Sequence, residues 1–158
     1  MERKLTQAMD DFINGLAGAM QAQGDIICEQ MKSTIANKPQ HANDNGEPYY
    51  ERTGRLIESI KSQTEADGNV VTTYIIADAK DPSGQYDYAE FLEYGTGKYN
   101  TSKTGRNTPW IYRDYWGNYH KTEGMKPYPF IEPAVMDAFD ALDSLFADVD
   151  ADIRKYKR

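Results

Sequence analysis

The sequence is poor in the residues that build metal and redox sites. It has one cysteine, Cys28, and two histidines, His41 and His120, among 158 residues. A single thiol cannot form an internal disulfide, and a zinc site needs several closely spaced cysteine or histidine ligands. We therefore expect no disulfide, no metal site and no cofactor. Cys28 adjoins an apolar helical stripe, which favours a packed residue in a reducing compartment over an activated thiolate.

Long hydrophobic runs are also missing. The longest uncharged stretch near the start, residues 12–24, has 13 residues and includes Asn14 and two glutamines. A membrane-spanning helix needs about 20 mostly apolar residues. The charged opening, residues 1–4, is not followed by the apolar segment of a secretory signal. We expect neither a membrane span nor a signal peptide.

Positive charge is the minority charge. The chain has 18 lysines and arginines against 25 acids, a net charge of −7, which disfavours a sequence-independent nucleic-acid binder. The distribution is uneven, because residues 97–128 hold six basic residues against two acids, whereas residues 130–153 hold seven acids and no base. Such segregation can orient a partner or a second copy of the chain. The alternative is two solvated faces that keep the protein soluble.

The apolar content is sufficient for one folded domain, which we assign to residues 1–158. Hydrophobic residues make up 39% of the chain and charged residues 27%, as in globular proteins. Apolar residues recur at steps of three, four or seven from Leu5 to Ile35, and at steps of three or four from Ile131 to Tyr156. This spacing predicts a long helix near each end. Gly24 favours a bend in the first helix.

The segment after the first helix contains a loop and a hairpin. Residues 37–52 are rich in Asn, Asp, Gly and Pro and predict a mobile loop. The β-prone runs 61–66 and 70–79 flank Asp67-Gly68-Asn69, which indicates an antiparallel hairpin.

Two short helices are predicted around this hairpin. Thr53 can cap a helix through Leu56, Ile57 and Ile60. Residues 86–95 place Tyr88, Phe91 and Leu92 at helical spacing before Gly95, where a helix would end. The sequence therefore predicts an α+β fold, in which the long N-terminal and C-terminal helices pack on a small antiparallel β-sheet, with a short helix and an inserted aromatic β-hairpin.

The aromatic insert, residues 97–128, is the main compositional oddity. Residues 86–128 hold eight of the twelve tyrosines and both tryptophans. Tyrosine, tryptophan and arginine are enriched at protein interfaces. The same side chains also stabilise sheets by packing, and aromatic faces can stack on sugars. All three roles are open at this point.

Gly117-Asn118 predicts a two-residue turn within this insert. Such a turn pairs Trp116 with Tyr119 and sets Asp114 opposite Lys121. The resulting aromatic face consists of Trp110, Tyr112, Trp116 and Tyr119.

The sequence contains little that supports a catalytic site. Glu90 and Glu93 lie three residues apart, and paired carboxylates can act as acid and base, but a solvated or ion-paired helix face is the expectation for such residues. Residues 95–98, GTGK, match a fragment of a phosphate loop without the spacing of the full motif. We expect a protein that is not an enzyme and has no catalytic residue.

Three stretches in order resemble a known family. They are TGRL with Ser59-Ile60 at residues 53–60, YAEFLEYGTG at residues 88–97, and PYPFIEPA at residues 127–134. Together they resemble the tail-completion or head-tail joining (neck) proteins of long-tailed bacteriophages. The insert WIYRDYWGNYHKTEG, residues 110–124, resembles one seen in many members.

The resemblance implies a structural virion protein of a phage or prophage, located in the neck or tail and in the host cytoplasm during assembly. It implies a homo-oligomeric ring that completes the tail and joins it to the head connector, with the connector and tail-tube proteins as partners. DNA would pass through the lumen without specific binding. A basic insert meeting an acidic neighbour suits such a ring.

We expect subunit contacts from seven residues: Arg55, Glu93, Tyr94, Trp110, Tyr112, Trp116 and Tyr119. The alternative function is a small binding module that uses the aromatic hairpin face to bind a glycan or a peptide.

Overall fold

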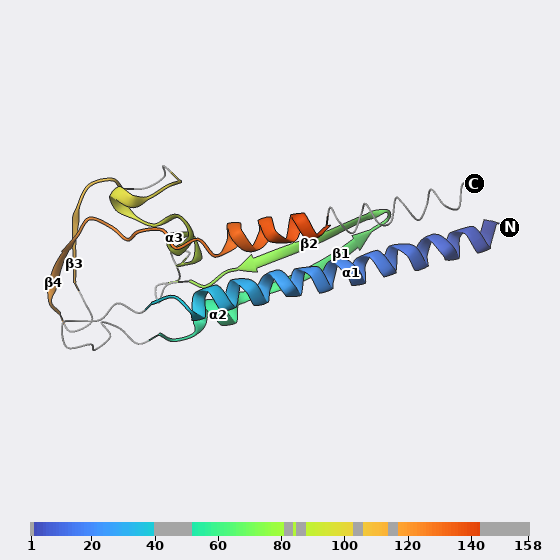
Figure 1. Ribbon diagram of the computed structural model, residues 1–158, viewed down its shortest axis with the longest axis horizontal. Coiled ribbons are helices and arrows are strands. Elements are labelled where there is room, and N and C mark those ends of the chain that lie inside the picture. The colour runs from blue at the N-terminus through green and yellow to red at the C-terminus, as the bar shows by residue number, and fades with distance from the viewer. Residues whose placement is uncertain are drawn as a thin grey trace. The chain divides into compact units, whose positions relative to one another are not determined.

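The protein has the predicted α+β fold (Figure 1). The computed structural model describes residues 2–39, 52–80, 84, 88–102, 106–113 and 117–142. The elements are α1 (Glu2–Ala36), α2 (Arg55–Ser59), β1 (Ile60–Asp67), β2 (Val70–Ala77), α3 (Tyr88–Tyr94), the 3-10 helix η1 (Gly97–Tyr99), β3 (Trp110–Arg113), β4 (Tyr119–Thr122) and a last helix over residues 131–142.

These elements group into two compact units, each assembled from segments far apart in the chain. The first unit includes described residues 2–39, 60–76 and 131–142. The second includes residues 52–59 and the described residues between 77 and 130. The first unit therefore contains α1, the β1–β2 hairpin and the last helix, whereas the second contains α2, α3, η1 and the β3–β4 hairpin.

The core of the first unit forms where α1 runs along β1 (Figure 1). One stripe of α1 is buried, at Ile27, Cys28, Met31 and Ile35. This spacing of one, three and four residues keeps the side chains on one side of the helix. Ile60 of β1 is buried as well. Burial of each large aliphatic side chain contributes about 1.5–3 kcal/mol, so this stripe fixes the helix on the hairpin.

Helix α1 is continuous through Gly24 to Ala36, and the predicted bend at Gly24 stays a prediction. Gly24 also has a packing role. A Cβ atom at this position would lie 2.9 Å from Ser62 Cβ and 2.9 Å from Thr73 Cγ2. The missing side chain lets the helix backbone approach both strands of the hairpin.

Two glycines of α1 should respond in opposite directions to alanine. Gly24→Ala is expected to lower the free energy of unfolding by about 1–3 kcal/mol, because the added methyl group overpacks the contact with Ser62 and Thr73. Gly18→Ala meets nothing within 4 Å, so it should raise stability by up to about 1 kcal/mol through helix propensity. Urea unfolding followed by far-UV circular dichroism measures both. A stabilising Gly24→Ala would contradict the close approach.

The last helix buries its small residues. Ala134 and Ala138 are buried, while Val135 and Leu142 are half-buried. The helix begins at residue 131, so Pro133 lies in its first turn, where proline is tolerated. The predicted extension to Tyr156 lies outside the described residues.

The short elements follow the sequence prediction closely. The β1–β2 hairpin turns at Gly68-Asn69, as expected. Helix α3 ends before Gly95, which has φ +72°. Helix α2 ends at Ser59, so the expected extension through Ile60 is wrong, because Ile60 already begins β1. Most of the predicted 37–52 loop, residues 40–51, lies outside the described residues.

The aromatic hairpin forms with a different register from the predicted one. Arg113 pairs with Tyr119, Tyr112 with His120, and Ile111 with Lys121. The predicted two-residue turn is therefore wrong, as is the pairing of Asp114 with Lys121. The connection spans residues 114–118, of which 114–116 lie outside the described residues. Arg113 Nε donates to the Gly117 carbonyl at 3.1 Å, which closes the wider loop.

None of the helices in the described ranges is both long enough and apolar enough to cross a bilayer.

Candidate functional site

Two segments of the second unit, residues 92–98 and 123–130, join through their backbones and form what we call the glycine junction. Thr96 N donates to the Met125 carbonyl at 2.8 Å, and Lys98 N donates to the Glu123 carbonyl at 2.9 Å. Met125 N donates back to Thr96 Oγ1 at 2.9 Å. These bonds fix the end of α3 against the segment that follows β4.

The contact is close because two of its residues have no side chain. Gly97 has φ +62° and Gly124 has φ +117°, values that side chains disfavour. A Cβ on Gly97 would overlap the Glu123 carbonyl, and a Cβ on Gly124 would overlap the Thr96 carbonyl. The GTGK segment therefore serves packing, and the N–H groups of Thr96 and Lys98 are already donated within the junction.

Glu93 holds the two segments of this junction together at Phe130. Its exposed fraction is 4%, and its Oε2 accepts the Phe130 N–H at 2.7 Å. Phe130 is fully buried, and Tyr128 N donates to the Leu92 carbonyl at 2.8 Å. Of the two expected alternatives, a solvated or an ion-paired helix face, the solvated one is wrong for Glu93, whereas Glu90 is exposed. The signal was present in the spacing, because Glu93 follows Ala89 by four residues and shares its buried side.

The predicted contact residues of the two short helices differ in exposure. Arg55 is the first residue of α2 and is exposed. Tyr94 ends α3 with its side chain exposed, while its carbonyl accepts the Thr101 N–H at 2.9 Å. Glu93 is buried within the second unit, so a direct subunit contact does not suit it. Arg55 and Tyr94 stay predicted contacts.

The predicted aromatic face of four residues is wrong in its composition. Residues paired across an antiparallel hairpin share a face, and neighbours along a strand alternate. Tyr112 stacks on its partner His120 with ring centroids 5.3 Å apart. Tyr119 pairs with Arg113 and therefore lies on the other face. Trp116 lies outside the described residues.

One face of the β3–β4 hairpin packs, at the Trp110 end, against the rest of the second unit. Trp110 shares the face of Tyr112 and is half-buried. A Cβ on Gly97 would lie 2.8 Å from Trp110 Cζ3, so the indole packs against the glycine junction. The predicted packing role of the aromatics therefore applies to Trp110.

The other face is exposed and positively charged. It consists of Ile111, Arg113, Tyr119 and Lys121, and we call it the cationic hairpin face. Ile111 and Tyr119 have exposed fractions of 67% and 74%. The Arg113 guanidinium lies over the Tyr119 ring, 5.9 Å from its centroid. Sequence reasoning missed this grouping because the register decides it.

Lys98 belongs to a different part of the basic insert. It forms an ion pair with Glu123 and lies 5.0 Å from the centre of the Tyr99 ring. The hydrogen bond between the two charged groups raises the pKa of Lys98 and lowers the pKa of Glu123. Part of the positive charge of the insert is thus balanced within the second unit.

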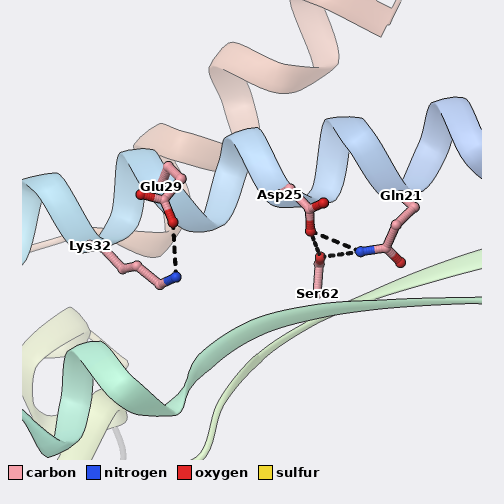
Figure 2. Close-up of polar contacts among 5 residues, drawn as sticks. All are labelled: Gln21, Asp25, Glu29, Lys32 and Ser62. Carbon is pink, nitrogen blue, oxygen red and sulfur yellow. Dashed lines mark hydrogen bonds and ion pairs between the residues drawn. The ribbon is translucent and has the colours of Figure 1, made fainter.

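A polar cluster joins α1 to β1 in the first unit (Figure 2). Gln21 Nε2 donates to Asp25 Oδ1 at 2.9 Å and to Ser62 Oγ at 2.6 Å. Ser62 Oγ also donates to Asp25 Oδ1. The hydrogen bond from Ser62, followed by that from Gln21, lowers the pKa of Asp25. A neighbouring ion pair between Glu29 and Lys32 lies along the same helix.

The lowered pKa of Asp25 predicts a pH-dependent contribution to stability. Its ionised form stabilises the fold above the pKa of the unfolded chain, and this contribution is lost as pH falls through the lower folded pKa. Ser62→Ala should raise the pKa of Asp25 toward its ordinary value in an NMR titration of the carboxyl carbon. The exposed neighbour Gln63→Ala is the control and should leave it unchanged. The same pKa in wild type and Ser62→Ala would contradict this assignment.

The remaining candidate groups carry no site. Cys28 is buried, and burial raises the pKa of its thiol, in agreement with a packed residue. Within the ranges that the structure describes, no group of three or more His, Cys, Asp or Glu residues is placed to hold a metal ion.

Comparisons of this chain with protein-family models, with curated proteins and with solved structures found no match.

Proposed function

We propose that this protein is a non-enzymatic ring subunit at the head-tail junction of a long-tailed phage or prophage. In this role it completes the tail and joins it to the head connector. The connector and the tail-tube proteins are its partners, together with further copies of itself.

The observation that carries the proposal is the ordered set of three resembling motifs. The second and third motifs are separated by 29 intervening residues, yet they meet in the glycine junction and in the Glu93–Phe130 hydrogen bond. Motifs that recur in order within a family and also pack together have a shared structural purpose. Here their contacts bring the two ends of the aromatic insert together within the second unit.

Exposed apolar side chains in both units support an assembly role. In the first unit they include Met9, Phe12, Val70, Met136 and Phe139, and in the second they include Tyr88, Tyr94, Ile111, Tyr112 and Tyr119. Large apolar side chains that stay exposed are available for contacts with other proteins. The net charge of −7 also suits a lumen that does not hold DNA.

The experiment is to produce virions without this protein and examine them by negative-stain electron microscopy. We expect DNA-filled heads and separate tails, and we expect wild-type protein supplied from a plasmid to restore joined particles. A plasmid carrying the gene with an early stop codon is the control. Joined, infectious particles formed in the absence of the protein would refute the proposal.

The glycan-binding or peptide-binding alternative is not proposed. It required Trp110, Tyr112, Trp116 and Tyr119 on one face, and the register puts Tyr119 on the other face from Trp110 and Tyr112.

A further inference from the structure

The cationic hairpin face has the properties of a contact surface. Its four residues are all exposed, and the two apolar members are exposed by two thirds or more. The sheet is two-stranded in the described part of the chain, and its strands have four residues each. A two-stranded hairpin gains stability from packing, and a docking partner would add such packing on the face opposite Trp110.

The last helix of the first unit carries a matching surface. Glu132, Met136, Phe139 and Asp140 follow one another at steps of four, three and one, so they lie on one side of the helix. All four are exposed, Met136 and Phe139 by 57% each. We call this side the acidic helix face. It lies away from the buried Ala134 and Ala138.

The two faces complement each other in charge and in apolar content. Each has two large apolar residues and two charged residues, positive on the hairpin and negative on the helix. We propose that the cationic hairpin face of one subunit docks on the acidic helix face of the next copy. The inference rests on the proposed function and names the contact that would build the ring.

The dimensions agree with such a contact. Glu132 and Asp140 are eight residues apart, which corresponds to about 12 Å along the helix axis. Arg113 and Lys121 lie at opposite corners of the hairpin face, and their long side chains extend its reach. Ile111 and Tyr119 are then placed to cover Met136 and Phe139.

The hairpin face is also preorganised. The Arg113 guanidinium is held by its bond to the Gly117 carbonyl and by the Tyr119 ring. Ordering long side chains on binding costs conformational entropy, so side chains that are ordered beforehand reduce that cost. A second copy is the occupant we favour over a nucleic acid, because the chain is acidic overall and supplies its own complement.

The two faces are different surfaces of one chain, so the contact is heterologous. Such a contact closes into a ring or extends into a filament. This property makes the proposal testable with charge reversal on each face separately.

The first experiment measures self-association by sedimentation over a wide concentration range. The double variant Arg113→Glu/Lys121→Glu and the double variant Glu132→Lys/Asp140→Lys should each weaken self-association by at least roughly tenfold. Lys126→Glu and Asp137→Lys change exposed charges outside the two faces and serve as matched controls. Circular dichroism verifies that each variant folds. Wild-type affinity in either double variant would overturn the proposal.

The second experiment mixes the two double variants. Each variant retains one intact face, and its reversed face complements the reversed face of the other variant, so the mixture should form alternating hetero-oligomers. Combining all four substitutions in one chain should restore higher oligomers, because the charges are exchanged. If both variants are folded by circular dichroism and their mixture stays monomeric, the proposal is overturned.

The third experiment traps the contact even where self-association is weak. In a Cys28→Ala background, Ile111→Cys and Met136→Cys in one chain should give a ladder of disulfide-linked oligomers on mild oxidation. Either cysteine alone should give dimers at most. A doubly substituted chain that gives only monomer would overturn the proposal. The proposal would also be overturned if Arg113→Glu/Lys121→Glu lost binding to single-stranded DNA but kept wild-type self-association.

The outcomes separate this inference from the proposed function. If both charge-reversal variants formed rings as the wild type does, the proposed contact would be refuted and the proposed function would stand. Phage particles that join without the protein would remove the proposed function, whatever the sedimentation result.

Discussion

Gly97→Ala is expected to unfold the second unit, with a loss of more than about 4 kcal/mol. The new Cβ would overlap the Glu123 carbonyl and press on the Trp110 ring, which lies 2.8 Å away. The Glu123 carbonyl belongs to the backbone and the Trp110 ring is rigid, so no flexible side chain can move aside. Urea unfolding followed by tryptophan fluorescence measures the loss, because Trp110 reports on this junction.

Gly68→Ala is the matched control for this substitution. Gly68 has φ +59°, close to the +62° of Gly97, but a Cβ there meets nothing within 4 Å. It should therefore show the cost of the left-handed backbone alone, about 1–2 kcal/mol. The difference between the two variants isolates the steric contact. Equal losses in both would mean that the close approach at Gly97 is not needed.

Glu93→Ala has the second-largest expected effect, a loss of about 2–4 kcal/mol. It removes the acceptor of the Phe130 N–H and leaves a cavity beside a fully buried side chain. Glu93→Gln keeps a carbonyl oxygen at this position and should cost less. Hydrogen exchange of the Phe130 amide gives a local readout, and it should be faster in Glu93→Ala.

Glu90→Ala provides the control on the same helix. Glu90 is exposed, so its replacement should change stability by no more than about 0.5 kcal/mol. If Glu90→Ala and Glu93→Ala lowered stability equally, the hydrogen bond to Phe130 would not explain the effect of Glu93.

Sequence reasoning predicted most of the regular elements because each of them depends on local pattern. The apolar spacing of α1 and the turn at Gly68-Asn69 are local signals, and both are confirmed. The hairpin register was wrong because Gly117-Asn118 suits a two-residue turn, whereas the Arg113–Gly117 hydrogen bond selects a wider loop. A shift of an odd number of residues exchanges the faces, and this moved Tyr119 away from Tyr112.

The candidate surfaces depend on tertiary packing, which local sequence patterns do not determine. Glu93 and Glu90 have the same chemistry, and only packing distinguishes the buried hydrogen-bond acceptor from the solvated acid. Likewise, Gly24 looked like a weak point of a helix, but its environment makes it a contact point with Ser62 and Thr73. Local propensity says nothing about which atoms a distant segment will bring to a residue.

The discontinuous make-up of the first unit has a consequence for biosynthesis. Its parts come from residues 2–39, 60–76 and 131–142, so synthesis of α1 and the hairpin leaves the unit without its last helix. Domains generally fold as units during translation, N-terminal parts first. Here we expect closure only after residues 131–142 have left the ribosome. Because the proposed acidic helix face lies on that same segment, a nascent chain cannot offer this face to a neighbour before its own first unit is finished.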